Sequence, residues 1–404
     1  MLPDTKNENK IKQTENKPQV NTFYLALAAR FKTARLVAIC VLVVFLLATV
    51  ILFRDDITVE NLRYLFKDLE IGDNISVTSN DEISFDADLQ VNLGLFKGDI
   101  AIAGSSYFYL TDLQGNKRLN ESSAFSNPVI SLSDKYLLVY GLSENTYTIY
   151  NTFASLHTET LDYPITGGVV SDKGFYAIVT RTAEYRSVVY LYNENFERIG
   201  VLSKDKYVTD IAFNKDSSEL LIVSVFSNNG NFCTEIVNYV PFSQTASSSI
   251  TVEGSMPIEA SYNIDGGFSV IYDNKIEFYD SEYVLRNTFI YPANVVPQTT
   301  YIGKKYTAFT YNENIVGDDI KALVFSNDGE LVCEVSAQGQ PKCINVFSDT
   351  AFVLLDGKLC KINIKNKEVS YYDIERNAID LLLVDENTAI VCFTDHTRKI
   401  SIDK

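Results

Sequence analysis

A short phrase of sequence recurs eight times along this chain of 404 residues. Each copy reads as an apolar strand, a tight polar turn and a second, more apolar strand, as in residues 95–102 and 132–139. The residue before the turn falls at positions 96, 132, 170, 213, 262, 302, 347 and 384, so the copies are 36 to 49 residues apart. A repeat of about 40 residues made only of strands is typical of a β-propeller. We therefore predict an all-β fold, an eight-bladed β-propeller over residues 80–404.

A second turn follows the first within a repeat, some 15 to 27 residues later, as at Asn327-Asp328-Gly329. Asn, Asp and Gly favour the primed turns of β-hairpins because they tolerate positive φ. We interpret this turn as the connection between the third and fourth strands of a repeat. Each blade is therefore predicted to be a four-stranded antiparallel meander.

The last repeat lacks a fourth strand of its own. After Val384 the sequence supplies strands at 388–393 and 397–402 and then reaches Lys404. Residues 82–86 form a short strand that precedes the first full repeat and has no other predicted partner. We expect this strand to complete the last blade, because it would close the ring and remove two exposed sheet edges.

An uncharged run of 18 residues, 36–53, lies between Arg35 and Arg54. As a helix it would be roughly 27 Å long, close to the thickness of a bilayer core. Residues 1–35 hold seven of the 35 basic residues but only three of the 52 acidic ones, so this tail is expected to stay in the cytoplasm. We predict a single-pass transmembrane helix at 36–53, an uncleaved anchor in preference to a signal peptide, with the propeller extracytoplasmic.

Residues 54–73 follow the predicted span. Apolar side chains recur there at spacings of three and four between two acids, Asp55 and Asp56, and Gly72. Acids favour the start of a helix and glycine its end. We predict a short juxtamembrane helix, a stalk that packs on the propeller or on a partner helix.

The domain after the span carries nearly all of the acidic residues. Such a surface should repel nucleic acid, because binding to phosphates depends on Lys and Arg. The acids also suffice to keep an exported domain soluble. We expect no nucleic-acid partner; the expected partners are the cell membrane, through the span, and an envelope protein or glycan.

Five of the six cysteines fall on predicted strands of the propeller among apolar neighbours. They are Cys233, Cys333, Cys343, Cys360 and Cys392. Cys333 and Cys343 belong to different blades, which should exceed the roughly 4.4–6.8 Å between Cα atoms that a disulfide requires. We therefore expect buried free thiols. An exported chain without a disulfide framework indicates a bacterial envelope.

The sequence contains no catalytic motif, and we assign no catalytic residue, metal site or cofactor. Two histidines, His157 and His396, do not make a metal cluster or a triad by themselves. Asp210, Glu259 and Asp380 fall near the starts of inner strands, where a ring brings distant acids together. They support an alternative prediction, an envelope hydrolase with carboxylates at the mouth of the central channel. A hydrated polar lining is the simpler interpretation.

The chain has no tryptophan but 25 tyrosines and 24 phenylalanines. WD-repeat propellers and quinone-dependent dehydrogenases place tryptophan at fixed positions in every blade, so neither family is favoured. The repeat architecture is nevertheless WD40-like. Tyr and Phe are therefore expected to fill the space between blades.

The basic tail, the run 36–53, the segment 59–66 and the repeats together resemble a family of bacterial, single-pass, membrane-anchored extracytoplasmic propellers catalogued as a domain of unknown function. The resemblance covers nearly the whole chain. It implies the fold and the membrane topology, and it assigns no catalytic residue.

We therefore predict a membrane-anchored binding or scaffolding propeller at the bacterial cell envelope. Binding is expected on the loops between second and third strands, because these vary in length while the blades stay regular. The longest are 227–231 and 312–319, followed by 181–186. The predicted binding residues are Tyr185, Arg186, Asn229, Asn231, Glu313 and Asp319. The alternatives are that these loops are tolerated insertions, or that the role is purely structural within a membrane complex.

Overall fold

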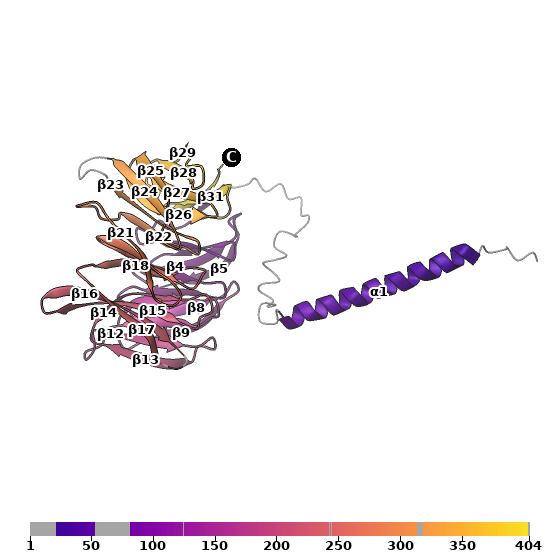
Figure 1. Cartoon of the computed structure of the whole chain (residues 1–404), viewed down its shortest axis with the longest axis horizontal. Helices are drawn as coiled ribbons and strands as arrows, with labels where there is room; N and C mark the ends of the chain where they lie inside the picture. Colours follow the sequence, from indigo (N-terminus) through magenta and orange to yellow (C-terminus); the bar gives the residue numbers. More distant parts are fainter. Residues whose placement is uncertain are drawn as a thin grey trace, which may run out of the picture. The chain divides into compact units, whose positions relative to one another are not determined.

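The computed structural model describes residues 22–52 and 81–402, apart from positions 124, 242, 244 and 313–317. The chain divides into two units, Met1–Asp73 and Asn74–Lys404, and each is considered by itself. The first contains α1 (Thr22–Leu52), and the second contains strands β1 to β32 in eight sheets (Figure 1). The predicted stalk, 54–73, lies outside the described residues.

Helix α1 is 31 residues long and includes most of the uncharged run 36–53. Over the described residues, no helix is both long enough and apolar enough to count as a membrane span.

Each of the eight sheets has four antiparallel strands, so the predicted eight-bladed propeller is confirmed. Blade 1 is β2 (Asn92–Phe96), β3 (Asp99–Ala103), β4 (Tyr107–Thr111) and β5 (Lys117–Ser122); blade 2 is β6 (Pro128–Leu132), β7 (Leu137–Gly141), β8 (Thr146–Tyr150) and β9 (Ser155–Thr160). Blade 3 is β10 (Ile165–Val170), β11 (Tyr176–Thr180), β12 (Ser187–Tyr192) and β13 (Arg198–Lys204); blade 4 is β14 (Tyr207–Phe213), β15 (Leu220–Asn228), β16 (Asn231–Val240) and β17 (Thr245–Glu253).

The second half of the ring repeats this arrangement. Blade 5 is β18 (Pro257–Tyr262), β19 (Phe268–Tyr272), β20 (Lys275–Tyr279) and β21 (Leu285–Ile290); blade 6 is β22 (Thr299–Ile302), β23 (Tyr306–Asn312), β24 (Asp319–Ser326) and β25 (Leu331–Gln338). Blade 7 is β26 (Pro341–Phe347), β27 (Thr350–Leu355), β28 (Lys358–Asn363) and β29 (Val369–Asp373); blade 8 is β30 (Asp380–Leu383), β31 (Thr388–Cys392), β32 (His396–Ser401) and β1 (Glu82–Ser84).

The first strand of each blade contacts the first strands of both neighbouring blades, in a closed circle that returns from β30 to β2. These eight strands therefore line the central channel. Because each blade is an antiparallel meander, its connections alternate between two faces of the ring. We call the side with the turns between first and second strands, and between third and fourth, the turn face. The side with the connections between second and third strands, and between blades, is the loop face.

The second and third strands form the core because neighbouring blades cover both of their faces. β3 (Asp99–Ala103) and β7 (Leu137–Gly141) are buried at every position, whereas the outer strand β9 (Ser155–Thr160) has no fully buried residue. Such double burial is why these strands read as continuous apolar runs. Aromatic pairs fill the space between blades as predicted, for example Phe108 against Tyr150 with ring centroids 4.3 Å apart.

The cysteines of the propeller are free, as predicted. Cys233, Cys333, Cys360 and Cys392 are buried, and Cys343 is partly buried. Burial raises the pKa of Cys360 to about 11, so this thiol stays protonated and unreactive at neutral pH.

The ring closes where the sequence predicted. β1 pairs antiparallel with β32, with Ile83 opposite Thr397. The Arg398 guanidinium pairs with Glu82 at 3.0 Å and with Glu375 at 3.1 Å. Ile83 also packs against the apolar cluster shared by blades 8 and 1. An N-terminal strand thus supplies the fourth strand of the last blade and fastens the two ends of the domain together.

We predict that Ile83→Asp lowers the free energy of unfolding by about 2 kcal/mol or more, because it places a charge in the contact that closes the ring. Urea titration followed by circular dichroism measures the change. Leu89→Asp is the matched control, because Leu89 is 88% exposed in the segment after β1. Equal unfolding midpoints for the two variants would contradict a closing role for β1.

Candidate functional site

Five of the six residues predicted to bind a partner lie on the loop face. Tyr185 and Arg186 are in the connection between β11 and β12, and Asn229 and Asn231 are at the β15–β16 hairpin. Asp319 begins β24, and Glu313 lies outside the described residues. Tyr185 and Arg186 therefore belong to blade 3, and Asn229 and Asn231 belong to the neighbouring blade 4. Asp319 belongs to blade 6.

The segment 227–231 was expected to be a loop, but most of it is strand. β15 continues to Asn228 and β16 begins at Asn231, with Asn229 and Gly230 alone at the tip. Both tip residues have positive φ, 50° and 83°, as a primed two-residue turn requires. Pairing of the two strands satisfies backbone groups that an open loop would leave to solvent. Blade 4 therefore extends beyond its neighbours as an ordered hairpin.

Blades 3 and 4 are joined on the loop face by a cationic and aromatic cluster. Arg186 donates a hydrogen bond of 2.7 Å to the Tyr207 hydroxyl, and its guanidinium lies 4.8 Å from the centre of the Tyr207 ring. Arg181 approaches the same ring at 5.5 Å. Tyr207 is 39% exposed and Tyr185 42% exposed. Such surfaces are common at protein interfaces, where aromatic and Arg side chains are enriched.

Asp319 borders a second hollow, between blades 6 and 7. The Gln338 amide donates a hydrogen bond of 3.1 Å to the Asp319 carboxylate. With Lys358 and Tyr371, these side chains line a pocket of about 380 Å³. Tyr371 is half exposed, so an aromatic face and several polar groups are open to a ligand there.

The acids predicted to line the channel do lie on first strands: Asp210 on β14, Glu259 on β18 and Asp380 on β30. Their carboxylates form hydrogen bonds that link neighbouring first strands. One Asp210 oxygen accepts a hydrogen bond of 2.8 Å from the backbone N–H of Ala260 in the next blade, and the other accepts one of 2.8 Å from Ile211.

Burial raises the pKa of all three acids. For Asp210 it raises the pKa to about 6, and the nearby Glu259 charge acts in the same direction. The backbone N–H donors partly compensate by stabilising the carboxylate. Because both Asp210 oxygens are occupied by the backbone, the geometry favours a bracing role between blades over general acid chemistry. Within the described ranges, no three Asp, Glu, His or Cys side chains form a group that could hold a metal ion.

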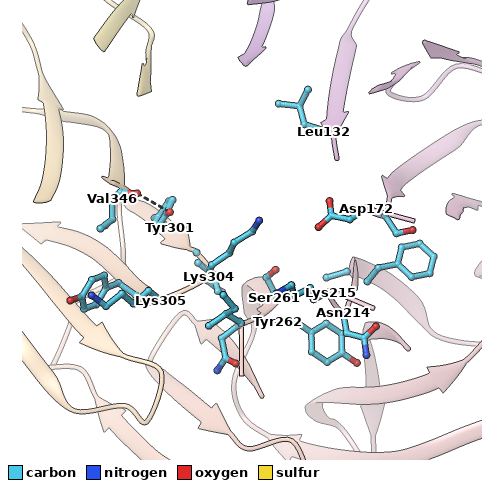
Figure 2. A pocket seen from close by; sticks show the side chains of 18 of the residues that line it. Leu132, Asp172, Asn214, Lys215, Ser261, Tyr262, Tyr301, Lys304, Lys305 and Val346 are labelled. Atoms are coloured by element: carbon cyan, nitrogen blue, oxygen red, sulfur yellow. Dashed lines mark hydrogen bonds between the residues drawn. The ribbon is translucent and has the colours of Figure 1, made fainter. Parts of the chain in front are cut away.

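The channel opens on the turn face into a pocket of about 530 Å³ (Figure 2). Its wall is formed by the ends of first strands and by the turns that follow them, contributed by blades 2 to 7. Apolar side chains such as Leu132, Val170 and Ile302 alternate there with aromatic rings, including Tyr262 and Phe347. The volume falls in the range of small-molecule sites.

Lysines stand at the rim of this pocket. Lys304 and Lys215 line it from the turns of blades 6 and 4, and Figure 2 shows the Lys304 side chain extending into the open space. Neither ammonium forms an ion pair or hydrogen bond with another described residue. The adjacent Lys305, in contrast, pairs with Asp349 at 2.6 Å. Lys304 and Lys215 were not among the predicted binding residues. Each lies in the turn after a first strand, and no local feature of the sequence distinguishes it from other turn lysines.

The model of a family of unknown function, DUF5711, matches residues 72–402. The chain belongs to the DUF5711 family. The resemblance to a propeller family of unknown function is therefore confirmed for the family and the fold. No curated protein matches the chain.

Solved structures share the fold of this DUF5711 chain at low identity. BamB from Moraxella catarrhalis is 11% identical, with a TM-score of 0.51 over 79% of this chain and 97% of that one. The β-propeller domain of Cps50 (Swd1) from Myceliophteria thermophila is 11% identical, with a TM-score of 0.50 over 72% of this chain and 98% of that one. At such identities the likeness concerns the fold alone.

We predict that the Asp210 carboxyl titrates near pH 6 in the folded chain. Because the folded-state pKa is above the unfolded value of about 4, the unfolding free energy falls as the pH rises from about 4 to 6, by roughly 3 kcal/mol. Carbon-13 NMR of the side-chain carboxyls measures the titration directly. Asp210→Asn should remove this part of the fall and leave the contributions of Glu259 and Asp380, whereas Asp328→Asn, which alters an exposed turn, should keep all of it. A midpoint below pH 4.5 would contradict the effect of burial.

Proposed function

We propose that this protein is a binding or scaffolding propeller of the bacterial cell envelope that presents its loop face to a partner. The observation that carries the proposal is the unequal length of the hairpins that reach that face. β15 and β16 have 9 and 10 residues, whereas β7 and β8 of blade 2 have 5 each. A regular ring with selected hairpins extended is the arrangement expected of a rigid scaffold that positions a recognition surface.

The chemistry of the extended region fits contact with a protein or glycan partner. Tyr185, Arg186 and Tyr207 combine exposed rings with cationic donors next to the blade 4 hairpin. Aromatic and Arg side chains contribute strongly to binding energy because they bury a large area and still donate hydrogen bonds. The overall net charge of −17 disfavours nucleic acid as the partner.

We further propose that the chain is held in the cell membrane by residues 36–53, with its N terminus in the cytoplasm and the propeller outside. The support is the absence of charge over these 18 residues and the excess of Lys and Arg before them. A membrane anchor would confine the loop face to partners of the envelope.

Shortening the blade 4 hairpin should abolish capture of the partner. The variant lacks two cross-strand pairs, Ser227 with Phe232 and Asn228 with Asn231. It keeps the strand register and the Asn229-Gly230 turn, so the blade should still fold. Full-length chains are cross-linked in cells, purified from detergent-solubilised membranes and analysed by mass spectrometry. We expect the specific cross-linked partner to be lost in this variant and in Tyr185→Ser/Arg186→Ser.

The matched control, Val284→Ser/Leu285→Ser, removes two exposed apolar side chains on the turn face and should leave capture unchanged. If the partner is recovered equally with the shortened hairpin, the loop face is not the binding surface.

Charges inside the proposed span should release the chain from the membrane. Val43→Arg/Val44→Arg adds two residues that each cost about 2.5–3.5 kcal/mol at the centre of a spanning helix. We expect wild type and the control Val43→Ala/Val44→Ala to remain in carbonate-washed membranes, and a C-terminal tag to be digested by protease added to spheroplasts. A wild-type chain found in the soluble fraction, or a tag protected from protease, would overturn the proposal.

A further inference from the structure

The pocket at the turn-face mouth of the channel is separate from the loop face and has its own chemistry. It combines an apolar and aromatic wall with the ammonium groups of Lys215 and Lys304. We propose that this pocket binds a small, singly charged organic anion, with its apolar or aromatic body in the channel mouth and its carboxylate, sulfonate or phosphate ester beside the two lysines. The proposal goes beyond the envelope-binding role and is independent of it.

The charge of the rim favours an anion. Four charged side chains line the pocket: Asp172, Lys215, Lys304 and Lys305. Lys305 is engaged by Asp349, which accepts its hydrogen bond at 2.6 Å and also pairs with Lys365 at 2.5 Å. Two lysines and one aspartate remain, a local excess of one positive charge in a chain whose net charge is −17. A singly charged anion neutralises this excess, whereas a polyanion would meet Asp172.

Asp172 is already committed to the protein. Its carboxylate accepts a hydrogen bond of 2.9 Å from the backbone N–H of Asp134 in the turn of the neighbouring blade. It forms no ion pair with Lys215 or Lys304 among the described residues. The two ammonium groups are therefore left to solvent or to a ligand.

The backbone beneath each lysine is fixed, although the side chains are exposed. The Lys304 carbonyl accepts a hydrogen bond of 2.9 Å from Ile264 of blade 5. The Lys215 turn is held by Asn214, whose side-chain oxygen accepts a hydrogen bond of 3.1 Å from the backbone N–H of Glu219. A ligand would therefore order two side chains without rearranging the turns, which lowers the entropic cost of binding.

The wall of the pocket is equally well supported. The Tyr301 hydroxyl donates a hydrogen bond of 3.0 Å to the Val346 carbonyl, from blade 6 to blade 7, as the dashed line in Figure 2 marks. This bond keeps the ring at the edge of the channel, where it offers apolar surface. Tyr262 and Phe347 extend that surface on either side. An apolar body of moderate size can thus be covered by several rings while its charged group stays at the rim.

The test uses two fluorescent dyes that share one aromatic framework. 8-Anilinonaphthalene-1-sulfonate carries one negative charge, and N-phenyl-1-naphthylamine is the same molecule without the sulfonate. We expect wild type to bind both at one site per chain. In Lys215→Gln/Lys304→Gln the Kd for the sulfonate should rise roughly tenfold, while the Kd for the neutral dye stays the same. Added NaCl should weaken binding of the sulfonate alone.

The matched control is Lys135→Gln/Lys173→Gln. These lysines occupy the equivalent turns of blades 2 and 3 but lie outside the pocket lining. The control therefore loses the same charge from the same face of the ring as Lys215→Gln/Lys304→Gln. The control should keep wild-type affinity for both dyes. Equal weakening by the control would mean that only the general charge of the face acts, and it would overturn the proposal.

A third variant locates the dye. Ser261→Trp fills the pocket from its wall and should weaken binding of both dyes. Unchanged binding by a folded Ser261→Trp chain, or no saturable binding by wild type, would also overturn the proposal. If Ser261→Trp fails to fold, the two double-lysine variants still test the proposal. None of these variants touches the loop face, so the partner capture described above can succeed or fail separately.

Discussion

The middle strands of every blade are buried between two other blades, so only a closed ring gives each sheet a neighbour on both faces. The contact that completes the circle is the pairing of β1 with β32, reinforced by the ion pair between Glu82 and Arg398. Without it, blade 8 would present an open edge and the cluster shared by blades 8 and 1 would lose one wall. The channel, its mouth and the spacing of the hairpins all follow from this closure.

The fold could be predicted from the sequence because its determinants are local and repeated. The second strand of each repeat is buried on both faces and therefore reads as an uninterrupted apolar run, as in β7 (Leu137–Gly141), and a polar turn precedes it. The missing fourth strand of the last repeat identified the closing segment near Ile83. The segment 227–231 was misinterpreted as a loop because its residues are polar. In the structure the Asn229-Gly230 turn allows the strands to continue to the tip, where polar side chains point into solvent without loss of pairing.

The pocket could not be predicted in the same way. Its wall combines residues about 40 positions apart from six blades, and each of them has an ordinary role within its own repeat. Lys304 and Lys215 look like turn residues in sequence, because nothing local says whether a turn lysine has a partner. Lys305 illustrates the difficulty: it is next to Lys304, yet it is paired with Asp349. The distinction depends on blade-to-blade geometry, which the repeat spacing does not encode.

The channel also separates its charges along its length. Asp210 and Glu259 lie two residues before Ala212 and Ser261, which form part of the pocket wall, so the acids stand deeper in the channel than the lysines of the rim. Asp210 accepts a hydrogen bond from the backbone N–H of Ala260 in the next blade, and Glu259 accepts one from the backbone N–H of Ile302, which keeps these charges in place. An anion that enters from the turn face therefore meets attraction first and repulsion further in. Electrostatics alone would hold such a ligand at the mouth, in contact with the aromatic wall, and would oppose its passage through the ring.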